Sequence, residues 1–151
     1  MDSIKQARIR AGRYLARREY CQKELVEKLS AVGVQRAIAQ QCVAELAELD
    51  LVSDARFAKS LVEVRARKGY GPLRIADELR RRGVGSDLIS SSLNESDSKW
   101  TERLSELVAR KYGDSHPEDF KQWAKRSNFL RTRGFTSEQI NQTLGQFRRE
   151  A

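Results

Sequence analysis

The sequence predicts an all-α protein in which three tandem three-helix units form an elongated, curved repeat array. Three observations lead to this prediction. Apolar residues recur every three or four positions along most of the chain, one glycine-centred pattern appears three times, and no run rich in Val, Ile or Thr alternates with period two. We expect the units over residues 1–52, 53–95 and 96–151, each near the lower size for independent folding.

The repeat is centred on Gly33, Gly83 and Gly134, which are 50 and then 51 residues apart. A leucine stands four residues before each glycine, Val or Phe follows it directly, and Val or Leu stands ten residues after it. Tyr20 and Tyr70 each stand thirteen residues before their own glycine. Glycine can supply the left-handed residue that ends a helix, so each glycine is expected to end the second helix of its unit.

The helices of the first unit follow from its apolar stripes. Its expected core residues are Ile4, Ala7, Ala11, Tyr14, Leu15, Leu25, Val26, Leu29, Ile38, Cys42, Val43, Leu46 and Leu49. Tyr20 and Tyr70 are both expected to cover core surface, although either could instead stack or form hydrogen bonds at the surface.

In the second unit, Ser53 is expected to cap the first helix, and Gly69 to end it. Gly71 and Pro72 should open the next helix, since proline suits the first helical position. The expected core residues are Phe57, Leu61, Val64, Ile75, Ala76, Leu79, Leu88, Ile89 and Leu93.

In the third unit, Thr136 and Gln139 form a capping-box pattern at the start of the last helix. His116 is interpreted as a helix-start residue ahead of Pro117, with Glu118 and Asp119 in the first helical turn. The expected core residues are Trp100, Leu104, Leu107, Val108, Phe120, Trp123, Phe129, Leu130, Ile140, Leu144 and Phe147.

Composition narrows the class of protein. The chain is 39% hydrophobic and 33% charged, it contains no apolar run of membrane-spanning length, and its N-terminus has no apolar signal-peptide core. A cytoplasmic location is therefore expected. The net charge of +8 and a pI near 9.8 favour an anionic partner such as nucleic acid or a nucleoprotein, although many basic proteins bind no anion specifically.

No motif indicates an enzyme, a metal site or a cofactor. The "GYGP" segment from Gly69 to Pro72 matches neither a P-loop nor a dinucleotide fingerprint, which favours a turn and helix start. His116 is the only histidine, and the acidic pairs suit helix starts. Cys21 and Cys42 lack the spacing of metal ligands and are expected to be reduced thiols. We therefore expect no catalytic residues, no metal, no cofactor and no small-molecule substrate.

Basic residues recur before the repeat glycines. Any one of them could belong to a solvated helix face, or could stabilise a helix C-terminus. Their recurrence in register instead suggests a continuous positive surface for a partner. A helix-turn-helix reader of DNA sequence is disfavoured, because "VGSDLISSSLNES" after Gly83 contains no basic residue. The expected partner-binding residues are Arg65, Arg67, Lys68, Tyr70, Arg74, Arg81, Arg17, Arg18, Arg131 and Arg133.

The segment "RARKGYGPLRIADELRRRGV", together with "YLARREYCQKELVEKL", "SDARFAKSLVEVRARKGYGP" and "FLRTRGFTSEQI", resembles the RecX family, regulators of the bacterial recombinase RecA. The order and spacing of these segments fit across nearly the whole chain. The chain departs from the family at Cys21, where a capping Ser is usual, and at "LVSD" (51–54), where "LDD" is more common.

The resemblance implies three tandem three-helix units and a non-enzymatic protein that modulates, and mainly inhibits, RecA in recombination, DNA repair and the SOS response. It implies binding in the helical groove of RecA–DNA filaments, with lowered ATPase, strand-exchange and coprotease activity, and weak, non-specific binding to DNA. The alternative is a DNA-binding protein that acts alone through sequence-independent phosphate contacts. No membrane partner is expected.

Overall fold

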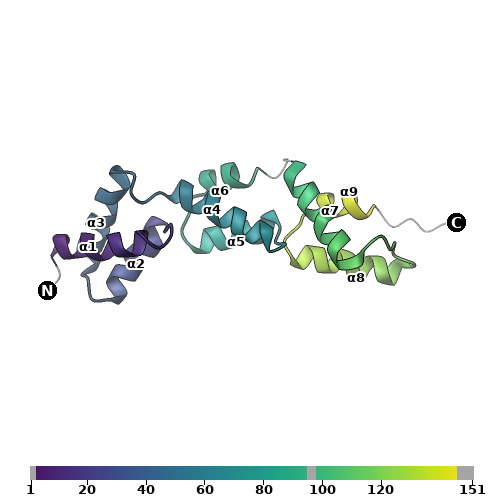
Figure 1. The fold of residues 1–151 in the computed structure, drawn as a ribbon, viewed down its shortest axis with the longest axis horizontal. Helices are drawn as coiled ribbons and strands as arrows, with labels where there is room; N and C mark the ends of the chain where they lie inside the picture. The colour runs from purple at the N-terminus through teal and green to yellow at the C-terminus, as the bar shows by residue number, and fades with distance from the viewer. Residues whose placement is uncertain (1–2, 95–97, 146–151) are drawn as a thin grey trace. The chain divides into compact units, whose positions relative to one another are not determined.

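The structure is a computed structural model that describes residues 3–94 and 98–145, and over these ranges it is helical with no β-strand. Figure 1 shows the helices in chain order. They are α1 (Ile4–Leu15), α2 (Gln22–Ala31), α3 (Arg36–Glu48), α4 (Asp54–Arg67), α5 (Pro72–Arg81), α6 (Ser86–Leu93), α7 (Ser98–Tyr112), α8 (Phe120–Thr132) and α9 (Ser137–Leu144).

Contacts divide the chain into two compact bodies. The first body comprises Met1–Leu61 and Glu78–Ser92, and the second comprises Val62–Asp77 and Leu93–Ala151. Helices α4 and α5 therefore each supply residues to both bodies. Because this grouping runs through the predicted second unit, the expected boundaries of the three units stay a proposal.

The core of the first body forms where α1, α2 and α3 pack together. Ala7 and Ala11 on α1 and Leu25 and Leu29 on α2 have no solvent exposure. Burying a leucine side chain stabilises a fold by about 1.5–3 kcal/mol, so this apolar stripe is the main local reason for the packing. Tyr20 is 3% exposed and belongs to the same cluster, which confirms its expected place in the core.

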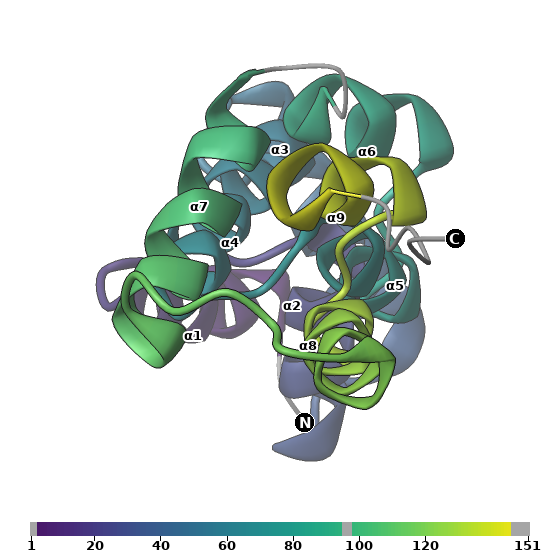
Figure 2. The ribbon, with the colours of Figure 1, turned by 90° about the vertical axis from the view of Figure 1, so that its right-hand side faces the viewer.

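The second body contains α7, α8 and α9, and α9 packs against both of the other helices (Figure 2). Trp100 and Leu104 on α7 are buried, as are Leu130 on α8 and Ile140 on α9. The indole Nε1 of Trp100 donates a hydrogen bond of 2.7 Å to the Leu93 carbonyl, which satisfies the polar atom of this buried ring.

The three repeat glycines end α2, α5 and α8 with the same hydrogen bond. Gly33, Gly83 and Gly134 have φ values of 98°, 91° and 99°, a region that side chains with a Cβ atom rarely adopt. In each case the amide of the next residue donates to the carbonyl of the leucine four residues before the glycine, at 3.0, 3.0 and 3.2 Å. The sequence prediction of three equivalent helix ends is confirmed.

The predicted helix starts agree with the structure in three places and differ in one. Ser53 Oγ accepts from the Arg56 amide at 3.2 Å, Pro72 is the first residue of α5, and Thr136 with Gln139 forms a capping box. The prediction for α8 was wrong. This helix begins at Phe120, because the side chain of Asp119 caps it by accepting from the Gln122 amide at 2.9 Å. His116, Glu118 and Asp119 therefore precede the helix.

The resemblance implies a capping Ser at position 21, and the start of α2 has different contacts there. Cys21 is the N-cap residue but makes no side-chain cap hydrogen bond. The amide of Gln22 instead donates to Asp54 Oδ1 at 2.7 Å. The Cys21 thiol is buried and donates to the carbonyl of Arg82 at 3.1 Å. A carboxylate from α4 therefore satisfies one of the open amides at this helix start.

Three residues expected in the core are exposed. Leu49, at 68% exposure, follows the last residue of α3, where the chain leaves the packed surface. Val64 is 41% exposed on α4, whose buried residues include Phe57, Ala58 and Val62. Phe120 is 51% exposed at the start of α8 and stacks on Trp123, with ring centroids 6.0 Å apart. Phe147, also expected in the core, lies outside the described residues.

Candidate anion-binding site

The "GYGP" segment is a turn between two helices, as predicted. It begins after α4, where Gly69 has φ of 90° and the Tyr70 amide donates to the Arg65 carbonyl at 3.1 Å. Gly71 then leads into α5 at Pro72. The turn carries Tyr70 with its ring half-buried and Lys68 exposed beside it.

Backbone hydrogen bonds join this turn to the end of α8 in the second body. The Gly71 amide donates to the Arg133 carbonyl at 2.7 Å, and the Leu73 amide donates to the Gly134 carbonyl at 2.9 Å. A Cβ atom at Gly71 would lie 2.6 Å from the carbonyl carbon of Gly134, a distance that real Cβ atoms do not show. The glycine at 71 is therefore needed for this close approach.

Two guanidinium groups lie against the ring of Tyr70. The Arg74 Cζ is 4.3 Å from the ring centroid, and the Arg133 Cζ is 5.0 Å from it. Arg74 Nη1 also donates to the Thr132 carbonyl and Arg133 Nη1 to the Lys68 carbonyl, both at 3.3 Å. These two carbonyls lie at the C-terminal ends of α8 and α4, where the helix dipole favours positive charge. We call Lys68, Tyr70, Arg74 and Arg133 the Tyr70 cluster.

The Tyr70 cluster carries positive charge that no carboxylate of the described residues compensates. Among the described residues, no Asp or Glu forms an ion pair with Arg74 or Arg133. Arg74 and Lys68 are exposed, and Arg133 is half-buried. Guanidinium groups form strong, directional hydrogen bonds with phosphate and carboxylate oxygens, so the cluster is suited to bind an anionic group of a partner.

The other predicted partner-binding residues of the second body lie close to the Tyr70 cluster in sequence but are not part of it. Arg65 is half-buried in the last turn of α4. Arg67 is exposed and lines a groove with residues of α7. Arg131 is exposed in the last turn of α8. The structure places the Tyr70 ring beside Arg74 and Arg133, and the Lys68 carbonyl accepts from Arg133. Arg67, expected in one patch with Lys68 and Arg74, instead lines the groove with α7.

The expected residues of the first body have other surroundings. Arg18 forms an ion pair of 2.9 Å with Glu24, and its Cζ lies 3.7 Å from the centroid of the Tyr20 ring. The hydrogen bond to Glu24 raises the pKa of the Arg18 guanidinium. Arg17 is exposed and lines a shallow groove along α1 with Arg10 and Arg13. Arg81 is exposed at the end of α5.

Some of the basic residues that recur before the glycines have structural contacts. Arg82 forms ion pairs with Glu24 and with Glu78. Arg126 lies over the ring of Tyr112 at 4.3 Å and donates to the carbonyl of Ser115 at 2.8 Å. These arginines hold elements together, which is the role that the sequence left open for any single basic residue.

The described residues also bear on other kinds of site. No group of three or more His, Cys, Asp or Glu side chains within 3–94 and 98–145 is placed to hold a metal ion. Burial raises the pKa of both Cys21 and Cys42, which disfavours the nucleophilic thiolate. In the same ranges, no helix has the length and apolar character required to cross a membrane.

Two successive segments of the chain match models of one protein family. Residues 53–93 match the family model described as "RecX, second three-helix domain", and residues 97–144 match "RecX, third three-helix domain". The chain is 40% identical over 131 residues to the "Regulatory protein RecX" of Stenotrophomonas maltophilia (strain R551-3), covering 87% of this chain and 80% of the relative. It is 39% identical over 130 residues to that of Pseudomonas entomophila (strain L48), covering 86% and 84%.

Solved structures share the fold. The crystal structure of RecX from Lactobacillus salivarius aligns with a TM-score of 0.78 at 23% identity, covering 93% of this chain and 94% of that chain. A second structure, titled "Crystal structure of regulatory protein RecX", aligns with a TM-score of 0.75 at 21% identity, covering 93% and 70%. On the extent of the sequence matches, this chain belongs to the RecX family of regulatory proteins.

Proposed function

We propose that this chain is a non-enzymatic modulator, mainly an inhibitor, of a RecA recombinase. In this proposal it binds RecA–DNA filaments in their helical groove and lowers ATPase, strand-exchange and coprotease activity. Family membership supports the regulatory role. The observation that supports a contact with the filament is the Tyr70 cluster. Two guanidinium groups lie over the same aromatic ring there, and no described carboxylate neutralises them. A cytoplasmic location follows from the proposed partner.

The cluster can contact a filament through two kinds of anion. Acidic side chains of the recombinase and phosphates of the bound DNA both match the donor geometry of a guanidinium group. Exposed charges at the edge of an interface alter association rate and salt dependence more than they alter the fold. Lys68 belongs to the cluster, and Arg67 precedes it in the chain and lines the groove beside α7. Both are exposed and make no side-chain hydrogen bond or ion pair among the described residues, so their charges can be reversed without removing a contact of the fold.

The test measures ATP hydrolysis by the cognate recombinase on single-stranded DNA, with and without this protein. We expect the parent to inhibit hydrolysis at stoichiometric amounts, and the double variant R67E/K68E to inhibit about tenfold less well, because each reversal replaces an attraction by a repulsion. Helicity and melting temperature should stay near those of the parent. No inhibition by the parent would refute the proposal. Full inhibition by the double variant would show that these two charges face solvent and do not contact the filament.

The second candidate is a DNA-binding protein that acts alone, and the same unneutralised cations favour it. It predicts tight binding to naked DNA at about 0.15 M salt, with an affinity that falls steeply as salt rises. A titration of labelled DNA without recombinase separates the two functions. The filament proposal predicts weak, non-specific binding in this assay.

A further inference from the structure

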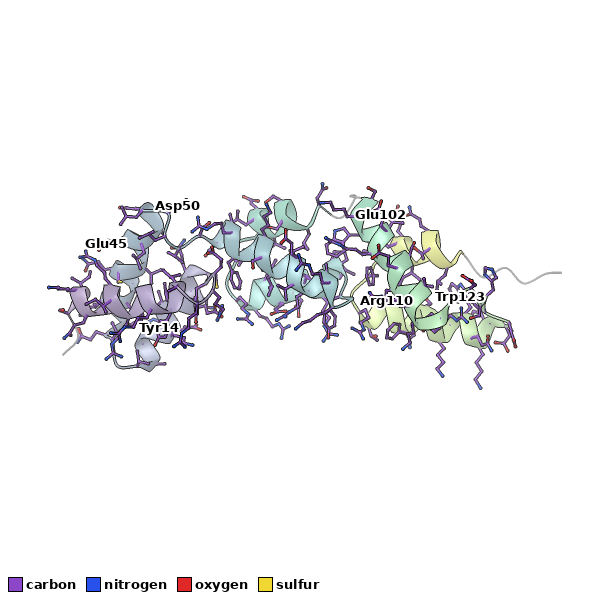
Figure 3. All side chains as sticks on the ribbon, in the orientation of Figure 1. Tyr14, Glu45, Asp50, Glu102, Arg110 and Trp123 are labelled. Atoms are coloured by element: carbon purple, nitrogen blue, oxygen red, sulfur yellow. The ribbon has the colours of Figure 1, made fainter. Side chains whose placement is uncertain are left out.

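A second basic feature of the second body lies in the groove between the end of α4 and α7. Ala66 and Arg67 line it from α4, and four residues line it from α7. These four are Arg103, Glu106, Ala109 and Arg110. Arg103, Glu106 and Arg110 recur every three or four residues and therefore share one face of the helix, and Ala109 is next to Arg110. Figure 3 labels Arg110 in the C-terminal half of α7.

The charged groups of this groove are not used to hold the fold. Arg67, Glu106 and Arg110 make no side-chain hydrogen bond or ion pair within the part of the chain that the structure describes, and all three are exposed. Arg103 is half-buried, with its Cζ 5.0 Å from the centroid of the Trp100 ring. The groove thus presents three cations and one carboxylate, and these groups can form hydrogen bonds with a partner.

The order of charges along α7 distinguishes between kinds of anionic partner. Arg103 and Arg110 are seven residues apart, which corresponds to about 10.5 Å of helix rise. Glu106 stands between them, three residues after one and four before the other. A nucleic-acid strand has a charge at every nucleotide and would have to place a phosphate near this carboxylate. A protein segment can place acidic side chains opposite the two arginines and a basic one opposite Glu106.

We propose that the groove binds an acidic segment of a protein partner, with two carboxylates about two helical turns apart and a basic or neutral residue between them, in preference to a nucleic-acid backbone. The apolar side chains of Ala66 and Ala109 would accept the aliphatic part of that segment. This inference rests on the proposed function only in expecting the partner to contain protein.

The test uses two labelled, alanine-based helical peptides of about twenty residues, a length at which such helices begin to form. The patterned peptide carries "EAAKAAAE", in which the lysine would oppose Glu106, and the uniform peptide carries "EAAEAAAE". We expect the full-length chain to bind the patterned peptide about threefold to tenfold more tightly, although its net negative charge is smaller. General attraction between a basic protein and an acidic peptide would give the opposite order.

The variant Glu106→Lys should reverse this preference, because it removes the carboxylate that the lysine of the peptide would meet. The variant R110E should weaken binding of the patterned peptide about tenfold, and circular dichroism should show its helicity unchanged. Lys125→Glu makes the same charge change at an exposed position on α8 and should leave binding within about twofold of the parent.

Three results would overturn the inference: equal or tighter binding of the uniform peptide by the parent chain, tighter binding of a ten-nucleotide oligothymidine than of the patterned peptide, or an R110E variant that binds like the parent. The ATPase assay is independent of these measurements. A parent chain that binds the peptides in the expected order but leaves ATP hydrolysis unchanged would support the groove and refute the proposed function.

Discussion

Two places at equivalent positions of the repeat, one in each body, differ in how they are bonded and in how their charge is neutralised. In the first body the start of α2 meets the residue before Gly83, since the Cys21 thiol donates to the Arg82 carbonyl. In the second body the start of α5 meets the residue before Gly134, since the Gly71 amide donates to the Arg133 carbonyl. We call these two places the α2 junction and the α5 junction.

The side chains of the two arginines show the difference. At the α2 junction, Arg82 is paired with Glu24 and Glu78, whose side chains are 16% and 19% exposed. At the α5 junction, Arg133 and Arg74 both lie over the Tyr70 ring, and Arg74 stands at the repeat position of Glu24, fifty residues further on. The comparison shows that whether the arginine is neutralised depends on the neighbouring side chains and not on the main-chain contacts of the junction. At the α5 junction, no described carboxylate pairs with Arg133 or Arg74.

The largest expected effect concerns the backbone of the α5 junction. Gly134→Ala should lower the free energy of unfolding by about 2–4 kcal/mol, because a Cβ atom would lie 2.5 Å from the Cβ of Arg74 and the residue has φ of 99°. Gly33→Ala has nearly the same φ with no atom within 4 Å, and should cost only about 1 kcal/mol. Chemical denaturation measures both. Equal losses would show that close packing at the junction contributes nothing.

A smaller effect on stability should distinguish Arg82, which neutralises two carboxylates, from Arg133, which pairs with none among the described residues. Arg82→Met should lower the free energy of unfolding by about 1–2 kcal/mol, since it leaves two largely buried carboxylates without their cation, a loss reduced by the partial exposure of Arg82. Arg133→Met should cost less than about 1 kcal/mol, because it removes stacking and one hydrogen bond but no ion pair.

Recombinase inhibition should show the reverse order. We expect Arg133→Met to weaken inhibition and Arg82→Met to leave it near the parent value, with each variant assayed below its melting temperature. If Arg82→Met weakened inhibition as strongly as Arg133→Met, the distinction between a neutralised and an unneutralised junction would be wrong.

The smallest expected effect concerns the ring that orders the two guanidinium groups. Tyr70→Leu removes both cation–π contacts, each worth about 0.5–1 kcal/mol at exposed sites, and should weaken inhibition about threefold by letting Arg74 and Arg133 move. Tyr70→Phe keeps the ring and should inhibit like the parent. A loss of inhibition in Tyr70→Phe would instead assign the contact to the phenol oxygen.

Sequence reasoning predicted those parts of the fold that depend on local signals. The glycine ends of α2, α5 and α8, the Ser53 cap and the capping box at Thr136 each need only a few consecutive residues. It was wrong at Leu49 and Phe120, because helical periodicity does not show where a packed face ends. The elongated, curved array stays a prediction.

The candidate site was predicted in part for the same reason. Short-range geometry predicts that the turn at Gly69 gathers Arg67, Lys68 and Arg74, and the structure places Tyr70 beside Arg74 but Arg67 in the groove with α7. That Arg133 joins them depends on a contact between α5 and the end of α8, which no local pattern shows. Arg103 and Arg110 were missed as well, although their spacing of seven residues on one helix face was visible in the sequence.

The hydrogen bonds of the α5 junction have a consequence for its surface charge. They join main-chain atoms, from the amides of Gly71 and Leu73 to the carbonyls of Arg133 and Gly134. The side chains of Leu73 and Arg133 can therefore change without losing these bonds, provided that the two glycines remain. The surface charge of this junction is therefore independent of the bonds that hold its backbone.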